Sequence, residues 1–173
     1  MSYRELLVGC GNSRKKKIHQ SDRPETFQNL TTLDMSPETG CDVVHDLDML
    51  PYPFGDNSFD EIHAYDVLEH QGRQGDWRFF FAQFGEFWRM LKPGGIFSAI
   101  VPAWDSPWSF GDPGHTRVIP KESLVFLSQA TYAREVGRTN MTDYRPWWKG
   151  DLETIALSDI GEHQFGFILK AIK

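Results

Sequence analysis

A short apolar run that ends abruptly in glycines is the feature that most restricts the fold of this chain. Leu6, Leu7 and Val8 are followed at once by Gly9-Cys10-Gly11. A strand buried on both faces of a parallel sheet reads as a continuous apolar run, and glycines allow a tight turn after it. We therefore predict a buried strand at residues 5–9, with a backbone at its carboxyl end that a ligand can approach closely.

An acid follows at the end of each of the next two predicted strands. Residues 30–35 form a short strand that ends at Asp34, and residues 42–45 form another that ends at Asp46. Asp34 follows Gly11 at about the 20-residue distance that separates a glycine turn from a ribose-binding acid. Because the carboxyl ends of parallel strands meet at one edge of a sheet, these residues indicate a nucleoside site there.

The clearest predicted helix opens at Gly75-Asp76 and is stopped by Pro93-Gly94-Gly95. Its aromatic residues recur at helical spacing, which is typical of a face packed against a sheet. We also predict strands at 59–64, 96–101, 152–157 and 164–172, a long loop at 103–119 and a helix at 120–130. This order predicts an α/β fold with a mostly parallel sheet and an antiparallel hairpin, about residues 152–172, at its C-terminal edge.

The segment between the first two strands lacks the pattern of a crossover helix. Residues 12–29 are polar, contain Pro24 and show no apolar residues at helical spacing. We therefore expect the first crossover helix to be reduced or missing. The basic run Arg14–Lys17 is expected to be a solvated loop rather than a phosphate grip.

Length and composition narrow the class of protein. With 173 residues, of which 40% are hydrophobic, the chain can bury one substantial core, so we expect a single domain over residues 1–173. The net charge of −6 disfavours a nucleic-acid partner. No apolar run approaches the ~20 residues of a bilayer span and no leader is visible, so we expect a soluble, cytoplasmic protein without membrane association. The composition leaves the oligomeric state open.

Neither cysteines nor histidines predict a metal site. Cys10 and Cys41 make no disulfide framework without a secretory signal. The histidines stand at positions 19, 45, 63, 70, 115 and 163. They have neither the spacing nor the cysteine neighbours of a zinc cluster, so no metal is expected.

Seven short motifs follow one another along the chain: Leu6–Asn12, Leu33–Pro37, Val43–Leu47, Leu50–Pro53, Asn57–Ile62, Val67–His70 and Leu91–Gly95. Together they resemble the class I S-adenosylmethionine-dependent methyltransferases, over core motifs at residues 5–127. The segment Gly111–Arg117 is similar to a motif of a compact, type 11-like subgroup, some members of which accompany glycan biosynthesis. The resemblance implies a Rossmann-like, doubly wound sheet, with S-adenosyl-L-methionine as cofactor and S-adenosyl-L-homocysteine as product.

The glycine turn itself favours this cofactor over a dinucleotide. A dinucleotide fingerprint needs a third glycine near Ser13, which is absent. A nucleoside without phosphates needs the close turn and the ribose acid but no phosphate cradle. The incomplete fingerprint therefore favours S-adenosylmethionine over NAD.

The resemblance also implies which residues bind the cofactor. These are Gly9, Cys10, Gly11 and Asn12 around the methionine moiety, Asp34 at the ribose, Met35 at the adenine face, Asp46 and Leu47 at the adenine amino edge, and Asp66 and Val67 beside the sulfonium. Asp34 or Asp46 alone could be a turn or helix-cap carboxylate. Together, at two strand ends, they favour ligand binding.

Residues for acceptor chemistry are less specific. The candidate general bases are His115, His70 and Asp105, and the candidate acceptor-binding residues are Trp104, Trp108 and Arg117, with Trp147 and Trp148 as further aromatic candidates. Both histidines could instead make structural hydrogen bonds. Arg117 could clamp an anionic acceptor or pair with Asp112.

These features predict a methyltransferase acting on an O or N atom of a small-molecule or glycan-like acceptor. Ala64-Tyr65-Asp66-Val67 departs from the tetrad of enzymes that methylate amino groups of nucleic acids, which disfavours adenine-N6 or cytosine-N4 transfer. The alternatives are a catalytically silent cofactor-binding module or partner subunit and, with less support, an NAD-dependent oxidoreductase.

Overall fold

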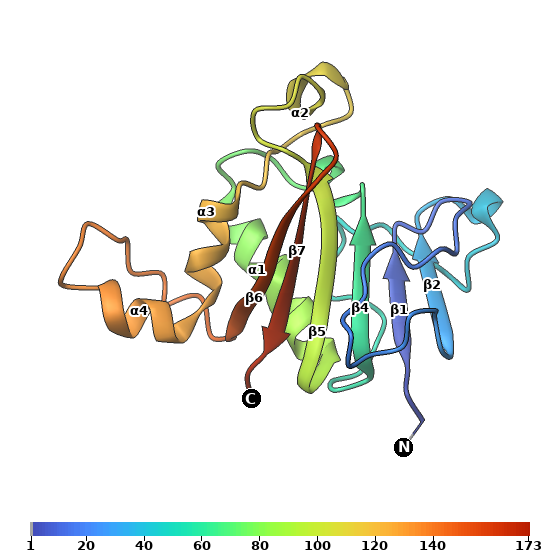
Figure 1. Cartoon of the computed structure of the whole chain (residues 1–173), viewed down its shortest axis with the longest axis horizontal. Coiled ribbons are helices and arrows are strands. Elements are labelled where there is room, and N and C mark those ends of the chain that lie inside the picture. The colour runs from blue at the N-terminus through green and yellow to red at the C-terminus, as the bar shows by residue number, and fades with distance from the viewer. Residues whose placement is uncertain (1) are drawn as a thin grey trace.

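A computed structural model describes residues 2–173, which form a seven-stranded sheet in the order β3-β2-β1-β4-β5-β7-β6 (Figure 1). The strands are β1 (Glu5–Val8), β2 (Leu30–Asp34), β3 (Val43–Val44), β4 (Phe59–Tyr65), β5 (Leu91–Pro102), β6 (Leu152–Ile160) and β7 (Gln164–Ala171). The α-helices are α1 (Trp77–Met90), α2 (Trp108–Gly111), α3 (Lys121–Leu124) and α4 (Gln129–Glu135), and the 3-10 turns are η1 (Pro37–Thr39), η2 (Leu68–His70) and η3 (Val125–Leu127).

The pairing of the strands confirms the predicted fold class. β1 pairs in parallel with β2 and β4, β2 with β3, and β4 with β5. β7 runs antiparallel to β5, and β6 antiparallel to β7, which gives the predicted C-terminal hairpin. The parallel strands therefore end at one edge of the sheet, above which lies α2 (Figure 1). Within residues 2–173, no helix is both long and apolar enough to cross a bilayer.

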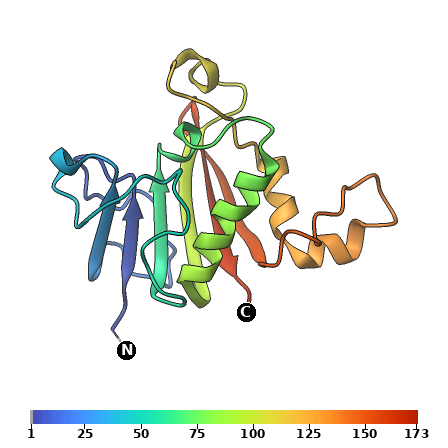
Figure 2. The same ribbon diagram turned by 180° about the vertical axis from the view of Figure 1, so that it is seen from behind.

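Helix α1 covers one face of the sheet (Figure 2). Asp76 is its N-cap, and its side chain accepts a hydrogen bond from the backbone N–H of Phe79. Phe84 and Phe87 are fully buried, and the ring of Phe87 stacks on Phe97 of β5 with 4.4 Å between centroids. The predicted aromatic stripe is therefore core packing.

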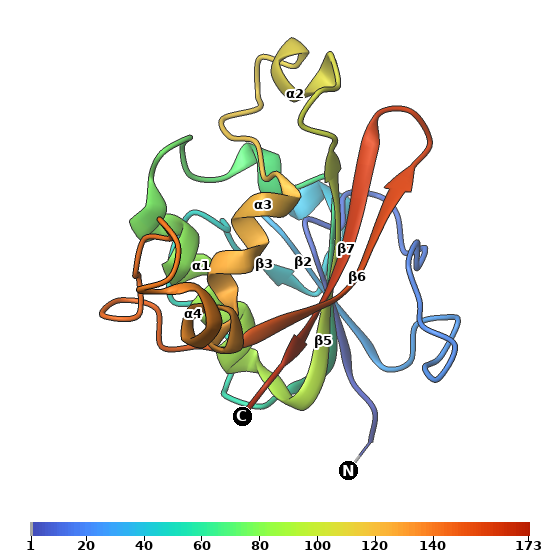
Figure 3. The same ribbon diagram turned by 60° about the vertical axis from the view of Figure 1, so that its left-hand side comes forward.

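The opposite face carries an extended segment instead of a crossover helix. Helices α1, α3 and α4 lie on one side of the sheet, and the segment after β1 lies on the other (Figure 3). This segment is held by Lys16, whose Nζ is 2.6 Å from Oε1 of Glu5 and 2.8 Å from Oε2 of Glu61. Only 1% of the Lys16 side chain is exposed, so the prediction of a solvated basic run is wrong for this residue.

The buried charges on this face stabilise one another. Glu5 and Glu61 are register partners on β1 and β4, and Nε2 of His63 is 3.1 Å from Glu61. Burial raises the pKa of Glu61, but contacts with His63, Lys16 and Tyr3 outweigh it and lower the pKa to about 2. The missing helix is thus replaced by a loop whose lysine neutralises acids that face it from the sheet.

Three predicted elements differ in detail. The predicted helix 120–130 is split at Ser128, whose backbone is extended and whose side chain caps α4 by accepting from Thr131. β5 already begins at Leu91 and includes Gly95, where a Cβ would make a tight contact of 3.1 Å with the carbonyl oxygen of Asp60. The predicted loop 103–119 contains the short helix α2.

Candidate functional site

The turn after β1 requires glycine at its first position. Gly9 and Gly11 have φ values of 60° and 48°, in the left-handed region that favours glycine. A Cβ on Gly9 would lie 2.1 Å from a methyl carbon of Val67. A Cβ on Gly11 would meet nothing within 4 Å, so the space above this residue is open to a ligand.

Asp34 at the end of β2 faces the same turn. Its Oδ2 accepts a hydrogen bond of 2.8 Å from the Gly11 N–H, and its Oδ1 accepts one of 2.9 Å from the Ser36 N–H. These bonds fix the carboxylate, and each oxygen retains a further lone pair. The half-buried carboxylate can therefore accept hydrogen bonds from ligand hydroxyls.

A cavity of about 370 Å³ opens between these strand ends, and we call it the nucleoside cavity. Its lining includes eight of the ten predicted cofactor residues: Gly9, Gly11, Asp34, Met35, Asp46, Leu47, Asp66 and Val67. The other two are placed elsewhere, because Cys10 is buried with 5% exposure and Asn12 is exposed beyond the turn. His45, Asp48, His70 and Gln71 complete the lining.

A second cavity of about 520 Å³, which we call the acceptor cavity, shares Asp66 and His70 with the first. Its lining is Asp66, Glu69, His70, Pro102, Trp108, Asp112, His115, Ile160, Glu162, His163 and Gln164. Asp66 has a φ of 54° and forms an ion pair of 2.7 Å with Lys17, and it also accepts a hydrogen bond from Gln164. Asp66, at the boundary between the cavities, is therefore fixed by the segment between β1 and β2 and by the C-terminal hairpin.

Three side chains that can accept a proton or bind a metal ion lie together in the acceptor cavity: Glu69, His70 and His115. Glu69 and His70 belong to η2, and His115 lies on the loop after α2. Nε2 of His115 is 4.0 Å from Oε1 of Glu69, and the two imidazole rings lie edge to face with 4.7 Å between centroids. Burial raises the pKa of Glu69 to about 7. The structure thus brings together the two predicted histidines.

Glu69 was missed by sequence reasoning. It directly precedes His70 in the motif Val67–His70, and a glutamate is expected to be exposed by default. Its carbonyl accepts hydrogen bonds from the N–H groups of Thr116 and Arg117, which are distant in sequence, so no local pattern reveals its surroundings. The adjacency of Glu69 and His70 was the available signal.

The other predicted acceptor residues are not brought together. Trp108 is 57% exposed and lines the acceptor cavity. Trp104 and Asp105 are exposed and do not line it. Trp147 is exposed, whereas Trp148 is a core residue with 2% exposure, so it offers no surface to an acceptor.

Arg117 does not form the pair with Asp112 that was one of the two roles considered for it. Its side chain is buried, its Nε donates a 2.8 Å hydrogen bond to the Leu68 carbonyl, and a second nitrogen donates to Gln83. Asp112 is not among its contacts in the described chain. Arg117 therefore holds η2 against α1. Burial lowers its pKa to about 10.

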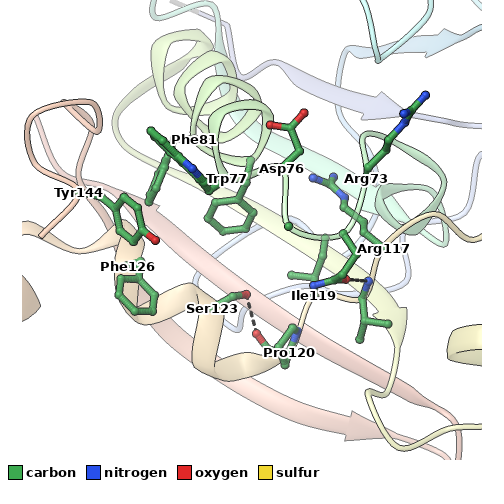
Figure 4. Close-up of a pocket in the computed structure, with 14 residues that line it drawn as sticks. Arg73, Asp76, Trp77, Phe81, Arg117, Ile119, Pro120, Ser123, Phe126 and Tyr144 are labelled. Atoms are coloured by element: carbon green, nitrogen blue, oxygen red, sulfur yellow. Dashed lines mark hydrogen bonds between the residues drawn. The ribbon is translucent and has the colours of Figure 1, made fainter. Parts of the chain in front are cut away.

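A third cavity of about 240 Å³ lies between α1 and the segment that carries α3 (Figure 4). Trp77, Phe81, Phe126 and Tyr144 form an aromatic wall, and Arg117 and Ile119 lie at the opposite side (Figure 4). Its lining shares no residue with the nucleoside cavity. This aromatic cavity is thus separate from the strand ends where the predicted cofactor residues gather.

The sequence matches one known protein family over most of the sheet-forming region. The family described as "Methyltransferase domain" matches residues 6–99, which is more than half of the sequence. The chain belongs to this methyltransferase family. This membership confirms the family predicted from the motifs, and with it S-adenosyl-L-methionine as the cofactor. A search of curated protein sequences finds no match.

Solved structures share the fold at low sequence identity. A putative methyltransferase in complex with the Trm112 activator of Haloferax volcanii is 15% identical with a TM-score of 0.59, over 99% of this chain and 83% of that one. The N-methyltransferase NodS of Bradyrhizobium japonicum is 13% identical (TM-score 0.57; 99% and 86%). A geranyl diphosphate C-methyltransferase of Streptomyces coelicolor, in complex with S-adenosyl-L-homocysteine, is 10% identical (TM-score 0.54; 99% and 71%).

Proposed function

We propose that this chain transfers the methyl group of S-adenosylmethionine to an O or N atom of a small-molecule or glycan-like acceptor. The observation that carries the proposal is that the nucleoside cavity and the acceptor cavity meet at Asp66 and His70. A methyl donor in the first cavity and an acceptor in the second would face each other at this boundary. Such positioning can supply about 7–11 kcal/mol of a displacement barrier.

The cofactor would be held by the strand ends. Asp34 would accept hydrogen bonds from the ribose hydroxyls, and Asp46 with Leu47 would meet the adenine amino edge. The open space over Gly11 would take the methionine moiety. When bound, the cofactor supplies an electrophilic methyl carbon on a sulfonium.

The acceptor would be prepared by the side chains of the second cavity. The nucleophile of the acceptor would lie over Glu69, His70 and His115, where its proton is withdrawn, an effect of about 10²- to 10⁴-fold in comparable enzymes. Trp108 offers an apolar surface that helps to exclude water. The mixed polar lining suits a hydroxylated or charged acceptor more than an apolar one.

Calorimetry of the purified chain tests the cofactor. We expect binding of S-adenosylmethionine and none of NAD at the same concentration. Tight NAD binding with no affinity for S-adenosylmethionine would refute the proposal and favour the oxidoreductase.

Transfer of a labelled methyl group to pools of small acceptors tests activity. Transfer that is lost in Asp34→Ala supports the enzyme. Cofactor binding without transfer to any pool would favour the silent module. The Haloferax neighbour was solved in complex with a methyltransferase activator, so transfer that needs a partner subunit is a further outcome of this assay.

A further inference from the structure

We propose that Glu69, His70 and His115 form a binding site for a divalent transition-metal ion in the acceptor cavity. The role of this site in methyl transfer rests on the proposed function. The sequence predicts no metal site, because the two histidines are far apart in the chain and lack the spacing of metal ligands. The structure brings them together, so the proposal departs from that prediction.

The three side chains are already near coordinating geometry. One potential ligand atom from each lies within 4.8 Å of the others. Two ligands of a tetrahedral ion, each about 2.1 Å from it, lie about 3.4 Å apart. Side-chain rotations that close the cluster by up to about 1.4 Å would therefore place all three around one ion. Oδ2 of Asp112, 3.9 Å from Nε2 of His115, lies at the rim as a further oxygen donor.

Both imidazoles are oriented in the manner of metal ligands. Nδ1 of His115 is 2.7 Å from the Trp108 carbonyl oxygen, and Nδ1 of His70 is 3.1 Å from that of Gly114. A carbonyl oxygen can only accept, so each neutral ring carries its hydrogen on Nδ1 and keeps the Nε2 lone pair. Histidine ligands of metals are commonly held by such a second hydrogen bond.

The carboxylate of Glu69 lacks a partner that a cation would provide. Glu69 is 3% exposed, and its Oε2 is buried without any hydrogen-bond partner. A buried, unpaired carboxylate oxygen is costly to the fold. It lines the same cavity as the two histidines. This unpartnered oxygen points to a bound cation independently of the spacing of the three side chains.

The backbone holds the two halves of the cluster together. The N–H groups of Thr116 and Arg117 donate to the Glu69 carbonyl at 2.9 and 3.3 Å. The loop that carries His115 is thereby pinned to η2, which carries the other two ligands. A site built from two segments fixed in this way is preorganised.

The donor set selects the class of ion. Two imidazoles and one carboxylate suit zinc, iron, cobalt or nickel, whereas magnesium and calcium prefer oxygen ligands. Three protein ligands leave a position open towards the cavity. An ion there would lower the pKa of an acceptor hydroxyl, which makes an oxygen nucleophile the favoured acceptor.

Methyl transfer to an acceptor oxygen can take place with this cation present. A lone pair of the acceptor oxygen forms the new O–C bond while the C–S bond breaks, and the bonding pair returns to sulfur. Because Glu69, His70 and His115 are then occupied by the ion, the hydroxyl proton leaves to water in the open cavity and not to these side chains. The ion changes no oxidation state in this step.

Titration of the chelator-treated full chain with Zn²⁺ by calorimetry tests the site. We expect one ion per chain, and a visible absorption band of bound Co²⁺ that Zn²⁺ displaces. Glu69→Gln and His115→Asn should each weaken Zn²⁺ binding at least tenfold, and Mg²⁺ should bind with far lower affinity. His70→Ala, the third cluster variant, should also weaken Zn²⁺ binding, and because His70 is exposed this change leaves the core untouched. Circular dichroism checks that each variant is folded.

His19→Ala is the matched control, because His19 is an exposed histidine 3.8 Å from a carboxylate, that of Glu25. It should bind Zn²⁺ like the wild type. No Zn²⁺ binding by the wild type, or unchanged affinity in all three cluster variants, would overturn the proposal. S-adenosylmethionine affinity is measured on the same samples without metal. S-adenosylmethionine binding without Zn²⁺ binding would overturn the metal site alone. Zn²⁺ binding without S-adenosylmethionine binding would overturn the proposed function and leave the metal site standing.

Discussion

The backbone N–H of Gly11 donates a 2.8 Å hydrogen bond to Oδ2 of Asp34, which ties the turn after β1 to the end of β2. The two residues are distant in sequence and adjacent in space because β1 and β2 are parallel neighbours. The bond fixes the side chain of the expected ribose acceptor before any ligand arrives. Such a contact reduces the cost of ordering the site on binding.

Replacement of Asp34 by alanine should weaken S-adenosylmethionine binding by about 1–3 kcal/mol, because the ribose hydroxyls lose a charged acceptor. Calorimetry measures this change. Asp34→Asn retains an acceptor for Gly11, so it separates loss of the charge from loosening of the turn. Asp22→Ala, at an exposed position outside the nucleoside cavity, should bind like the wild type. Wild-type affinity in folded Asp34→Ala would remove this residue from the site.

Alanine at Gly9 should destabilise the protein and abolish cofactor binding, because its Cβ would overlap Val67. Gly75→Ala is the matched comparison, since Gly75 also has a positive φ, 85°, but a Cβ there meets nothing within 4 Å. The backbone strain is common to both, at about 1–2 kcal/mol. Thermal denaturation should therefore show a larger loss for Gly9→Ala, and equal losses would contradict the contact with Val67.

The mostly parallel sheet and the meeting of its strand ends could be predicted because they depend on local signals. The apolar run before Gly9 and the acid at Asp34 each mark a strand end, and parallel strands bring such ends together. The buried side chains of Lys16 and Glu69 could not be predicted in this way. Charged residues are exposed by default, and their burial depends on partners from distant segments, such as Glu61 for Lys16.

The buried cluster around Glu61 predicts how stability depends on pH. Burial raises the folded-state pKa of Glu61, but contacts with His63, Lys16 and Tyr3 together outweigh it and lower the pKa to about 2, below the ordinary value of 4.5. The stability contributed by this carboxylate is therefore present above about pH 4.5 and is lost as the pH falls towards 2. Chemical denaturation across this range should show a declining free energy of unfolding.

Glu61→Gln isolates this contribution. At pH 7 it should lower the free energy of unfolding by about 3 kcal/mol or more, since it leaves a buried lysine with one carboxylate partner, Glu5. Its difference from the wild type should shrink as the pH falls from 4.5 to 2. Glu153→Gln, at an exposed position on β6, should stay parallel to the wild type throughout. A constant difference between Glu61→Gln and wild type would contradict the lowered pKa.

Replacement of His115 should lower turnover far more than it weakens cofactor binding. His115 lines the acceptor cavity and not the nucleoside cavity, so its loss leaves the cofactor contacts in place. We expect turnover to fall by up to about 10⁴-fold, the upper range for loss of a group that activates a nucleophile. Once an acceptor is known, turnover and S-adenosylmethionine affinity are measured on the same folded sample.

The choice of variant decides what the His115 result means. His115 also holds the loop after α2 through its 2.7 Å bond to the Trp108 carbonyl. His115→Ala removes both this bond and the Nε2 lone pair, whereas the amide of His115→Asn can still donate to that carbonyl. If the lone pair activates the acceptor, both variants lose turnover alike, and the asparagine variant keeps its thermal stability. If the histidine only holds the loop, His115→Asn recovers turnover, and an active His115→Asn enzyme would exclude His115 from the chemistry.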